Sequence, residues 1–177
     1  MQRNKAVLFW PVLIAVTAAD ALTKAVAVHW LQLPRVPREV LGNAVQLTLV
    51  YNPGAAFGLS FGEYSRWIFM ALTITALVIL ARLYATTRDQ DVPRTLSLAL
   101  VCGGAVGNLL DRLRSGLGVV DFIDVGLRDA RWPTFNVADM AVSVGALLLA
   151  WVLWVEDQQT AAAVSAPLGG GQPGEAS

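Results

Sequence analysis

Two aspartates in apolar surroundings are the residues of this sequence best suited to chemistry. Asp121 lies within the segment VVDFI, and Asp139 closes the segment FNVAD. An apolar setting raises the pKa of a lone carboxyl, and two carboxyls brought together there cannot both ionise easily. One then takes a proton from water while the other donates a proton to a carbonyl oxygen. The pair therefore favours an aspartic protease mechanism, which needs no metal and no organic cofactor.

Other kinds of site have little material in this chain. The 177 residues include one histidine, His29, and one cysteine, Cys102. A histidine-ligated metal centre, a Ser/His/Asp triad and a disulfide framework are therefore disfavoured. The formal net charge is zero, so no basic excess is available to bind a nucleic acid. Hydrolytic chemistry in this chain is expected to use carboxylates.

The elements that must position these aspartates are predicted to be membrane spans. Hydrophobic residues make up 55% of the chain and charged residues only 15%, whereas soluble domains are nearer a quarter charged. Each of four apolar runs is long enough to cross a bilayer: residues 6–28, 67–85, 95–113 and 136–155. The sequence therefore predicts a mainly α membrane protein with four transmembrane helices in one domain, residues 1–157. The low-complexity tail, residues 158–177, is predicted to be disordered.

The links between the spans differ in length and character. Residues 86–94 predict a plain turn. The loop 29–66 contains VQLTLVYN, whose alternation predicts a small antiparallel β-sheet that forms a cradle in this loop. The loop 114–135 holds Asp121 together with Asp124 and Asp129. We expect Asp124 to face solvent and Asp129 to be a surface charge.

The polar residues of the spans converge on one end of the molecule. Successive spans alternate in direction, so the two long loops share a side with the end of span one, the end of span three and the start of span four. From Lys5 to Lys24 the helical rise is about 28 Å, slightly less than the apolar thickness of a bilayer. The predicted cluster comprises Asp20, Lys24, Asn108, Asp111, Arg112, Asp121, Asn136 and Asp139. The basic start of the chain favours a cytoplasmic N-terminus, although basic residues occur in every loop.

Most members of this cluster also have a structural explanation. Asp20 and Lys24 are spaced i,i+4 and suit a salt bridge that helps the span insert. Asn136 and Asp139 suit a helix N-cap followed by a carboxylate in the first turn, which is compatible with catalysis. Asp121 has the weakest structural explanation of the set.

The third span combines close packing with charge. The glycines of its GGAVG segment have the small-residue spacing that lets membrane helices approach closely. Asn108, Asp111 and Arg112 follow on one helical face. A buried ion-pair network and a direct part in the chemistry remain equally good interpretations of these three side chains.

Five short motifs in order resemble lipoprotein signal peptidases, the signal peptidase II family. They are Asp20 with Thr23-Lys24, NPGAAFG from Asn52, GGAVGNLLDR from Gly103, VVDFI from Val119 and FNVAD from Phe135. The resemblance spans nearly the whole chain before the tail. It departs at Ala21, where family members often have Gln after the first-span aspartate.

The resemblance implies a function and a site. Asp121 and Asp139 would be the catalytic aspartates of an endopeptidase that cleaves just before the diacylglyceryl-modified cysteine of prolipoproteins. The residues implied to line or support the site are Asn52, Gly54, Asn108, Asp111, Arg112, Asn136, Asp20 and Lys24. The implied partners are lipid-modified signal peptides and membrane lipid. The implied location is the bacterial cytoplasmic (inner) membrane, with the site at its outer face and both termini cytoplasmic.

Two other classes of function compete with this interpretation. A small proton-coupled transporter would use intramembrane carboxylates as a relay, but it should carry polar residues through the whole membrane depth. A metal-dependent lipid-phosphate transferase would use Asp111, Asp121 and Asp124 as ligands, and its activity would vanish with a chelator.

Overall fold

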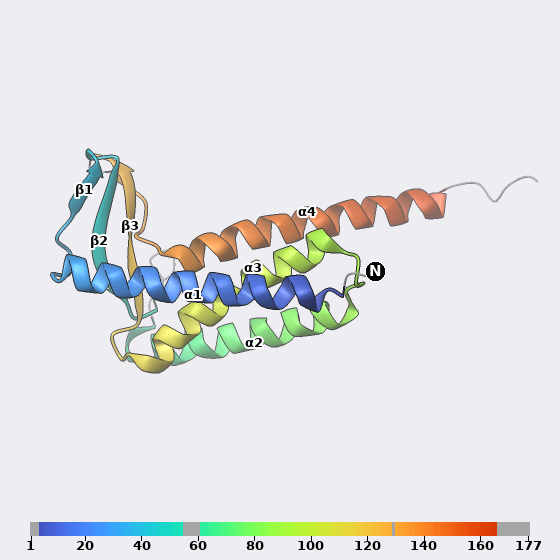
Figure 1. Cartoon of the computed structure of the whole chain (residues 1–177), viewed down its shortest axis with the longest axis horizontal. Helices are drawn as coiled ribbons and strands as arrows, with labels where there is room; N and C mark the ends of the chain where they lie inside the picture. Colours follow the sequence, from blue (N-terminus) through green and yellow to red (C-terminus); the bar gives the residue numbers. More distant parts are fainter. Residues whose placement is uncertain (1–3, 55–60, 129, 166–177) are drawn as a thin grey trace, which may run out of the picture.

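Four long helices lie side by side in the computed structural model, with a sheet across one end (Figure 1). The structure describes residues 4–54, 61–128 and 130–165. The helices are α1 (Ala6–Leu31), α2 (Ser65–Thr86), α3 (Val92–Arg114) and α4 (Val137–Ser165). All four are long and apolar enough to cross a membrane, since even the 22 residues of α2 rise about 33 Å. The prediction of four transmembrane helices is confirmed.

The end of α4 differs from the prediction. The helix continues to Ser165, so residues 158–165 are helical and the prediction of disorder was wrong for them; residues 166–177 lie outside the described part. Glu156 and Asp157 end the apolar run without ending the helix, because glutamate is a good helix former and a single aspartate lowers helix stability only slightly. The alanines 161–163 that follow favour helix even more strongly.

Helix α3 packs closely against α1 and α4 because of its glycines. A Cβ placed on Gly103 would lie 2.9 Å from the Cβ of Val16, and one on Gly104 would overlap the carbonyl oxygen of Ala138. Such close approach is what small residues allow between membrane helices. The packing interpretation of the GGAVG segment is confirmed.

The ends of the helices opposite the sheet are held by a few polar contacts. Asp91 caps α3 by accepting a hydrogen bond from the backbone N–H of Arg94 at 3.1 Å. The link between α2 and α3 is short, as predicted. Arg94 in turn pairs with Glu156 of α4 at 3.0 Å. Lys5 donates to the carbonyl of Thr87, just beyond the end of α2, at 2.6 Å. These contacts tie α1 to α2 and α3 to α4 at this end.

The sheet contains strands from both long loops. Its order is β1 (Arg38–Leu41), β2 (Val45–Asn52), β3 (Val119–Leu127) and β4 (Ala130–Arg131), all antiparallel. The strand predicted in VQLTLVYN is confirmed as β2. Its partner β3 comes from the loop 114–135, for which no strand was predicted. In the β2–β3 pair Val50 lies opposite Asp121, so the sheet itself positions this aspartate.

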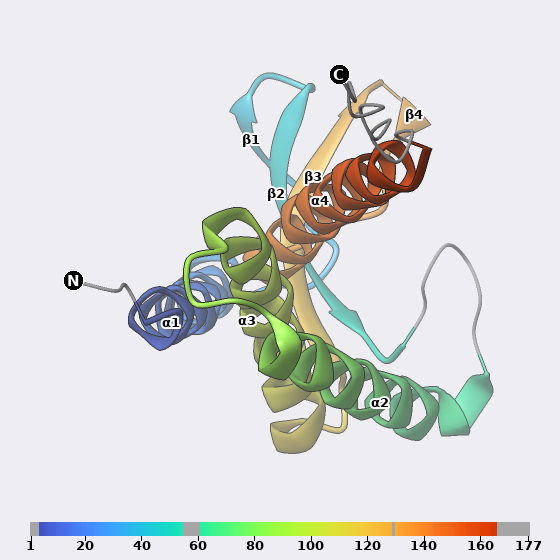
Figure 2. The ribbon, with the colours of Figure 1, turned by 90° about the vertical axis from the view of Figure 1, so that its right-hand side faces the viewer.

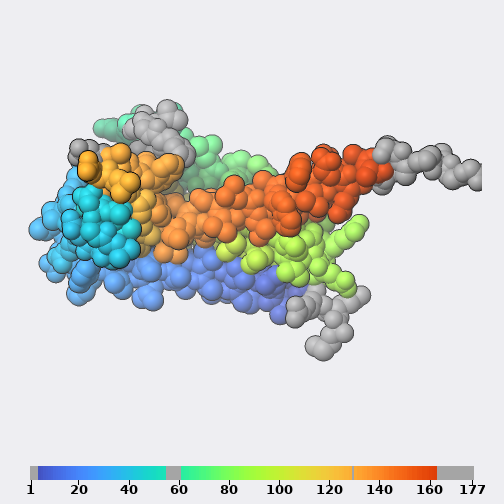
Figure 3. Space-filling view, turned by 90° about the horizontal axis from the view of Figure 1, so that it is seen from above, coloured from blue at the N-terminus to red at the C-terminus, as the bar shows by residue number. Residues whose placement is uncertain are grey.

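An apolar cluster fixes the sheet to the end of α1. Leu49 and Phe122 pack with Ala27 and Leu31 of that helix, and all four side chains are buried. The strands cross the ends of the helices instead of continuing their direction (Figure 1). The sheet therefore forms a cap on one end of the bundle, as the space-filling view shows (Figure 3).

Candidate active site

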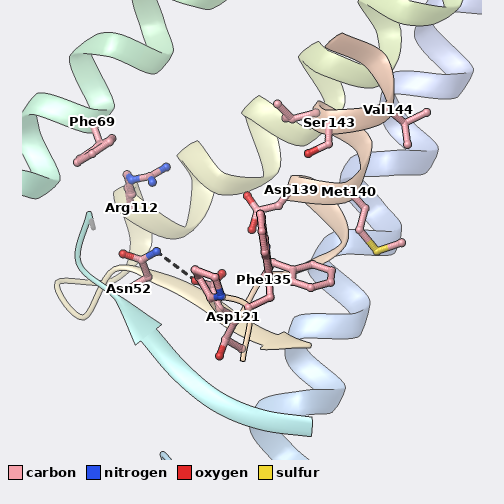
Figure 4. Close-up of a pocket in the computed structure, with 13 residues that line it drawn as sticks. Asn52, Phe69, Arg112, Asp121, Phe135, Asp139, Met140, Ser143 and Val144 are labelled. Carbon is pink, nitrogen blue, oxygen red and sulfur yellow. Dashed lines mark hydrogen bonds between the residues drawn. The ribbon is translucent and has the colours of Figure 1, made fainter. Parts of the chain in front are cut away.

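A cavity of about 670 Å³ opens where the sheet meets α3 and α4. Both candidate aspartates line it, Asp121 from β3 and Asp139 from the first turn of α4, together with Asn52 and Arg112 (Figure 4). The remaining wall is largely apolar: Phe69, Trp132, Pro133, Thr134, Phe135, Met140, Val142, Ser143 and Val144. The structure thus brings the carboxyls of the two predicted catalytic aspartates to one cavity.

Asp139 is oriented by the start of its own helix. Its backbone N–H donates to Oδ1 of Asn136 at 2.9 Å, while its Oδ2 accepts from the backbone N–H of Asn136 at 3.2 Å. This reciprocal pair is a capping box, which satisfies N–H groups that a helix start leaves free. The other oxygen accepts from Nδ2 of Asn108 at 2.8 Å. The predicted cap is confirmed, and it leaves the carboxyl on the cavity wall.

Asp121 is held by two amide donors in a buried position. Its oxygens accept from Nδ2 of Asn52 at 3.1 Å and from Nδ2 of Asn136 at 2.7 Å, and the residue is only 2% exposed. Burial, and to a smaller extent the charge of Asp139, raise the pKa of Asp121 to about 7. The two amide hydrogen bonds and Lys24 act in the opposite direction. Asp121 therefore keeps a proton to a higher pH than a solvent-exposed aspartate does.

Asn136 links the two aspartates directly. Its side-chain nitrogen donates to Asp121, while its side-chain oxygen and backbone N–H bind Asp139. The residue is fully buried, so these bonds have little competition from water. A single side chain therefore fixes the position of both carboxyls.

A buried lysine connects the backbone segments next to both aspartates. Lys24 Nζ lies 2.7 Å from Asp20, 2.8 Å from Asp111 and 2.9 Å from Asn108. The predicted Asp20–Lys24 salt bridge is confirmed, and it belongs to a larger ion-pair network within the span ends.

Each acidic partner of this network binds a backbone N–H beside an aspartate. Asp20 accepts from Ala138, the neighbour of Asp139, at 2.9 Å. Asp111 accepts from Val120, the neighbour of Asp121, at 3.3 Å. Neither Asp20 nor Asp111 is among the described residues that line the cavity. Their contacts support a positioning role.

Arg112 differs from its neighbours on α3, because its guanidinium lines the cavity. Nη1 donates to the carbonyl of Asn108 at 3.2 Å, and the group lies 5.7 Å from the ring centre of Phe69. Phe69 was not identified from the sequence, since one aromatic residue in an apolar span carries no distinguishing signal. The same holds for Met140 and Ser143 of α4.

The prediction for Asp124 was wrong. The side chain is buried, accepts from Thr48 at 3.0 Å and pairs with Arg131 at 2.6 Å. Its orientation follows from β3, which turns it to the face that also carries Thr48. Asp129 lies outside the described residues. Among the side chains that the structure describes, no three of His, Cys, Asp or Glu gather as a metal site, so the transferase alternative gains no support.

Two glycines shape the cavity edge near Asn52. The N–H of Gly54 donates to Oδ1 of Asn52 at 3.0 Å, and a Cβ there would lie 2.8 Å from the ring of Phe69. Gly118 has a φ of +100°, and a Cβ on it would overlap the backbone of Asn52. The remainder of the NPGAAFG motif, residues 55–60, lies outside the described part of the chain. Both glycines therefore help to hold Asn52, which donates a hydrogen bond to Asp121, in place.

Replacing Gly118 with Ala is expected to displace Asn52 and lower catalytic turnover by about 5- to 150-fold, since a single misplaced donor costs about 1–3 kcal/mol. Steady-state cleavage assays would measure this loss. Gly42→Ala is the matched control, because Gly42 also has positive φ but has open space around it. Equal activity of the Gly118 variant and the control would contradict the role of this contact.

The family of the chain follows from a match over most of its length. The family model described as Signal peptidase (SPase) II matches residues 12–155. The chain belongs to the signal peptidase II family. A lipoprotein signal peptidase from Moorella thermoacetica is 43% identical over 141 residues, which covers 79% of this chain and 88% of that protein. One from Syntrophotalea carbinolica is 44% identical over 140 residues, with 78% and 86% covered.

The fold also resembles that of a solved structure. A solved bacterial membrane enzyme, determined by the in meso method at 2.3 Å, matches with a TM-score of 0.79 and 25% identity over 89% of this chain and 94% of that one. As a signal peptidase II the protein is an aspartic endopeptidase of lipoprotein processing and a multi-pass membrane protein. This confirms the peptidase interpretation over the transporter.

Proposed function

We propose that the cavity cleaves prolipoproteins just before the diacylglyceryl-modified cysteine, with Asp121 and Asp139 as the catalytic pair. The observation that carries this proposal is the bridge made by Asn136, which fixes both carboxyls on one cavity wall. The lipoprotein signal peptidase relatives support the substrate class. The family match over residues 12–155 supports a peptidase domain of residues 1–157.

The chemistry follows from the different surroundings of the two carboxyls. Asp139 takes a proton from water, whose oxygen attacks the scissile carbonyl carbon, and protonated Asp121 donates its proton to the carbonyl oxygen. On collapse of the tetrahedral intermediate the C–N bond breaks, the proton on Asp139 passes to the leaving amine, and one hydroxyl of the intermediate returns its proton to Asp121. The cation of Arg112 and the amide of Asn52 line the cavity and are placed to bind the substrate backbone.

The depth of the cavity suits a lipid-modified substrate. Trp10 and Trp30 on α1 are both about half exposed, and the 20 residues between them rise about 30 Å, the apolar thickness of a bilayer. Tryptophan is enriched at the two membrane interfaces, so the sheet end containing Trp30 lies at one interface. The acyl chains would stay in lipid against the apolar cavity wall while the peptide bond reaches the aspartates.

We further propose that the sheet end faces the outside of the cytoplasmic membrane and that both termini are cytoplasmic. The start of α1 and the far end of α4 both lie at the end of the bundle away from the sheet (Figure 1). The basic residues at the start of the sequence favour retention of that side in the cytoplasm.

The proposal is tested with the purified full chain in detergent and a diacylglyceryl-modified prolipoprotein peptide. We expect cleavage just before the modified cysteine, located by product mass, and no cleavage of the same peptide with an unmodified cysteine. Activity should be unchanged by a chelator, because the mechanism uses water and carboxyls alone. Absence of cleavage, or its loss with chelator, would overturn the proposal.

The pH dependence should report the proton on Asp121. Because burial raises the pKa of this carboxyl to about 7, the protonated form is lost as the pH rises through that value. We expect kcat/KM to fall on an alkaline limb near pH 7. Asn52→Ala removes a hydrogen bond that lowers this pKa, so it should shift the limb to higher pH while lowering turnover. A limb that stays in place in this variant would contradict the assignment.

A further inference from the structure

One face of the outer part of the sheet carries polar side chains. We define the outer part as β1, residues 45–47 of β2, which precede the bulge after Leu47, and residues 123–125 of β3, which pair with them. Gln46 lies opposite Glu39 on one side and opposite Asp124 on the other, so the three side chains share a face. Gln46 and Asp124 are nevertheless buried, and Asp124 is paired with Arg131. The polar face is thus largely satisfied within the protein.

The opposite face is apolar and open. Leu41 and Val125 lie opposite Val45, and Ile123 lies opposite Leu47. Leu41 is 70% exposed, and the other four side chains are only half-buried. A sheet in water covers its apolar face and leaves its polar face open. Here the exposures are reversed, which indicates that the open apolar face does not meet water.

The direction of this apolar face is set by Asp121. Side chains alternate along β3, so Asp121 shares the face of Ile123 and Val125, and its carboxyl accepts a hydrogen bond from Asn136 at the start of α4. This face therefore looks toward the helices and the membrane that they span. Figure 2 shows β1 and the adjoining end of β2 reaching beyond α1 and α3. The open apolar face is therefore continuous with the lipid-facing surface of the spans.

A charged residue lies on this face at the level of the membrane interface. Arg38 pairs with Leu47, and its guanidinium lies 5.0 Å from the ring centre of Trp30. Trp30 is about half exposed near the end of α1, where tryptophan marks the headgroup level. A guanidinium is well suited to bind a phosphate. Arg38 is thus placed at the depth of phospholipid phosphates.

We propose that the outer part of the sheet lies in the membrane interface, with Leu41, Val45 and Val125 in contact with lipid and Arg38 bound to a phospholipid phosphate. Apolar burial and arginine contacts are the two forces that hold interfacial elements on a bilayer. This contact would hold the sheet, and with it the β3 strand that carries Asp121, at a fixed depth. It is separate from the peptide-bond chemistry and does not depend on it.

The test uses the full chain in nanodiscs of phosphatidylcholine and phosphatidylglycerol. Nitroxide labels are placed in Leu41→Cys and Glu39→Cys variants, each with Cys102→Ala, and collision with oxygen is compared with collision with a water-soluble nickel chelate. Leu41 and Glu39 are both exposed on β1 but point to opposite faces, so each controls for the other. Leu147→Cys on α4, which is 73% exposed, gives the lipid-embedded reference.

We expect the label at position 41 to favour oxygen several-fold more than the label at position 39, in the direction of position 147. Equal access of the nickel chelate to positions 41 and 39 would overturn the proposal. Adding Arg38→Glu should reduce the oxygen preference at position 41, and an unchanged value would refute the phosphate contact. These readouts do not use peptidase activity, so they stay decisive even if the proposed cleavage is not observed.

Discussion

Asp139→Asn and Asp121→Asn are each expected to lower kcat/KM for the lipid-modified peptide by about 10²–10⁴-fold, the usual contribution of acid–base groups. Asparagine keeps the shape of the side chain and can still accept from Asn108 or Asn136, so the fold should persist. It cannot accept a proton from water or donate a carboxyl proton. Cleavage rates and thermal unfolding in the same detergent would separate lost chemistry from lost stability.

Asp124→Asn is the matched control for this experiment. Asp124 is also a buried carboxyl on β3, but it pairs with Arg131 and is not among the described residues lining the cavity. Its replacement should leave turnover per folded molecule close to that of the wild type. If the Asp124 variant lost as much turnover as the Asp121 variant, or if either dyad variant stayed active, the catalytic assignment would fall.

The second large effect is expected at Lys24. Its charge is buried and lies between two carboxylates, those of Asp20 and Asp111. Lys24→Met would leave both negative charges without a partner in this network, and breaking a buried pair costs about 3–5 kcal/mol. Because the two carboxylates hold the backbone beside each catalytic aspartate, turnover should fall with stability. Thermal unfolding and kcat/KM, measured side by side, would test this.

Two variants make this prediction specific. Asp20→Asn leaves one positive and one negative charge in the network and keeps an acceptor for the N–H of Ala138, so it should be milder than Lys24→Met. Arg94→Met breaks the Arg94–Glu156 pair, in which the glutamate side chain is 41% exposed, and should cost about 1 kcal/mol or less. A Lys24 variant no less stable than the Arg94 variant would refute the role of the network.

The sequence was informative wherever one strong force decided the structure. Hydropathy located all four spans, and alternation located β2. A charge within a membrane costs free energy, and this cost indicated that Asp20, Lys24 and the two catalytic aspartates belong to one cluster. The capping pattern of Asn136 and Asp139 was readable because both partners lie within one helical turn.

The remaining features depend on partners that are distant in sequence. Strand β3 escaped prediction because VVDFIDV is apolar on both faces: Phe122 packs on α1, while Val119 is also buried. Asp124 was misplaced because its partner Arg131 is brought near by the β3–β4 turn. The end of α4 was misjudged because the residues that stop a membrane span do not stop a helix. The apolar cavity wall has no signature that separates Phe69 or Met140 from ordinary lipid-facing residues.

The capping role of Asn136 couples catalysis to a local equilibrium. Unwinding of the first turn of α4 breaks its bonds to Asp139 and releases its hold on Asp121, so the reactive geometry exists only in molecules whose first turn is closed. Helix ends open more readily than the rest of a fold. The working fraction of the enzyme can therefore decline on warming before the bundle unfolds, and amide exchange at Asp139 should follow that decline.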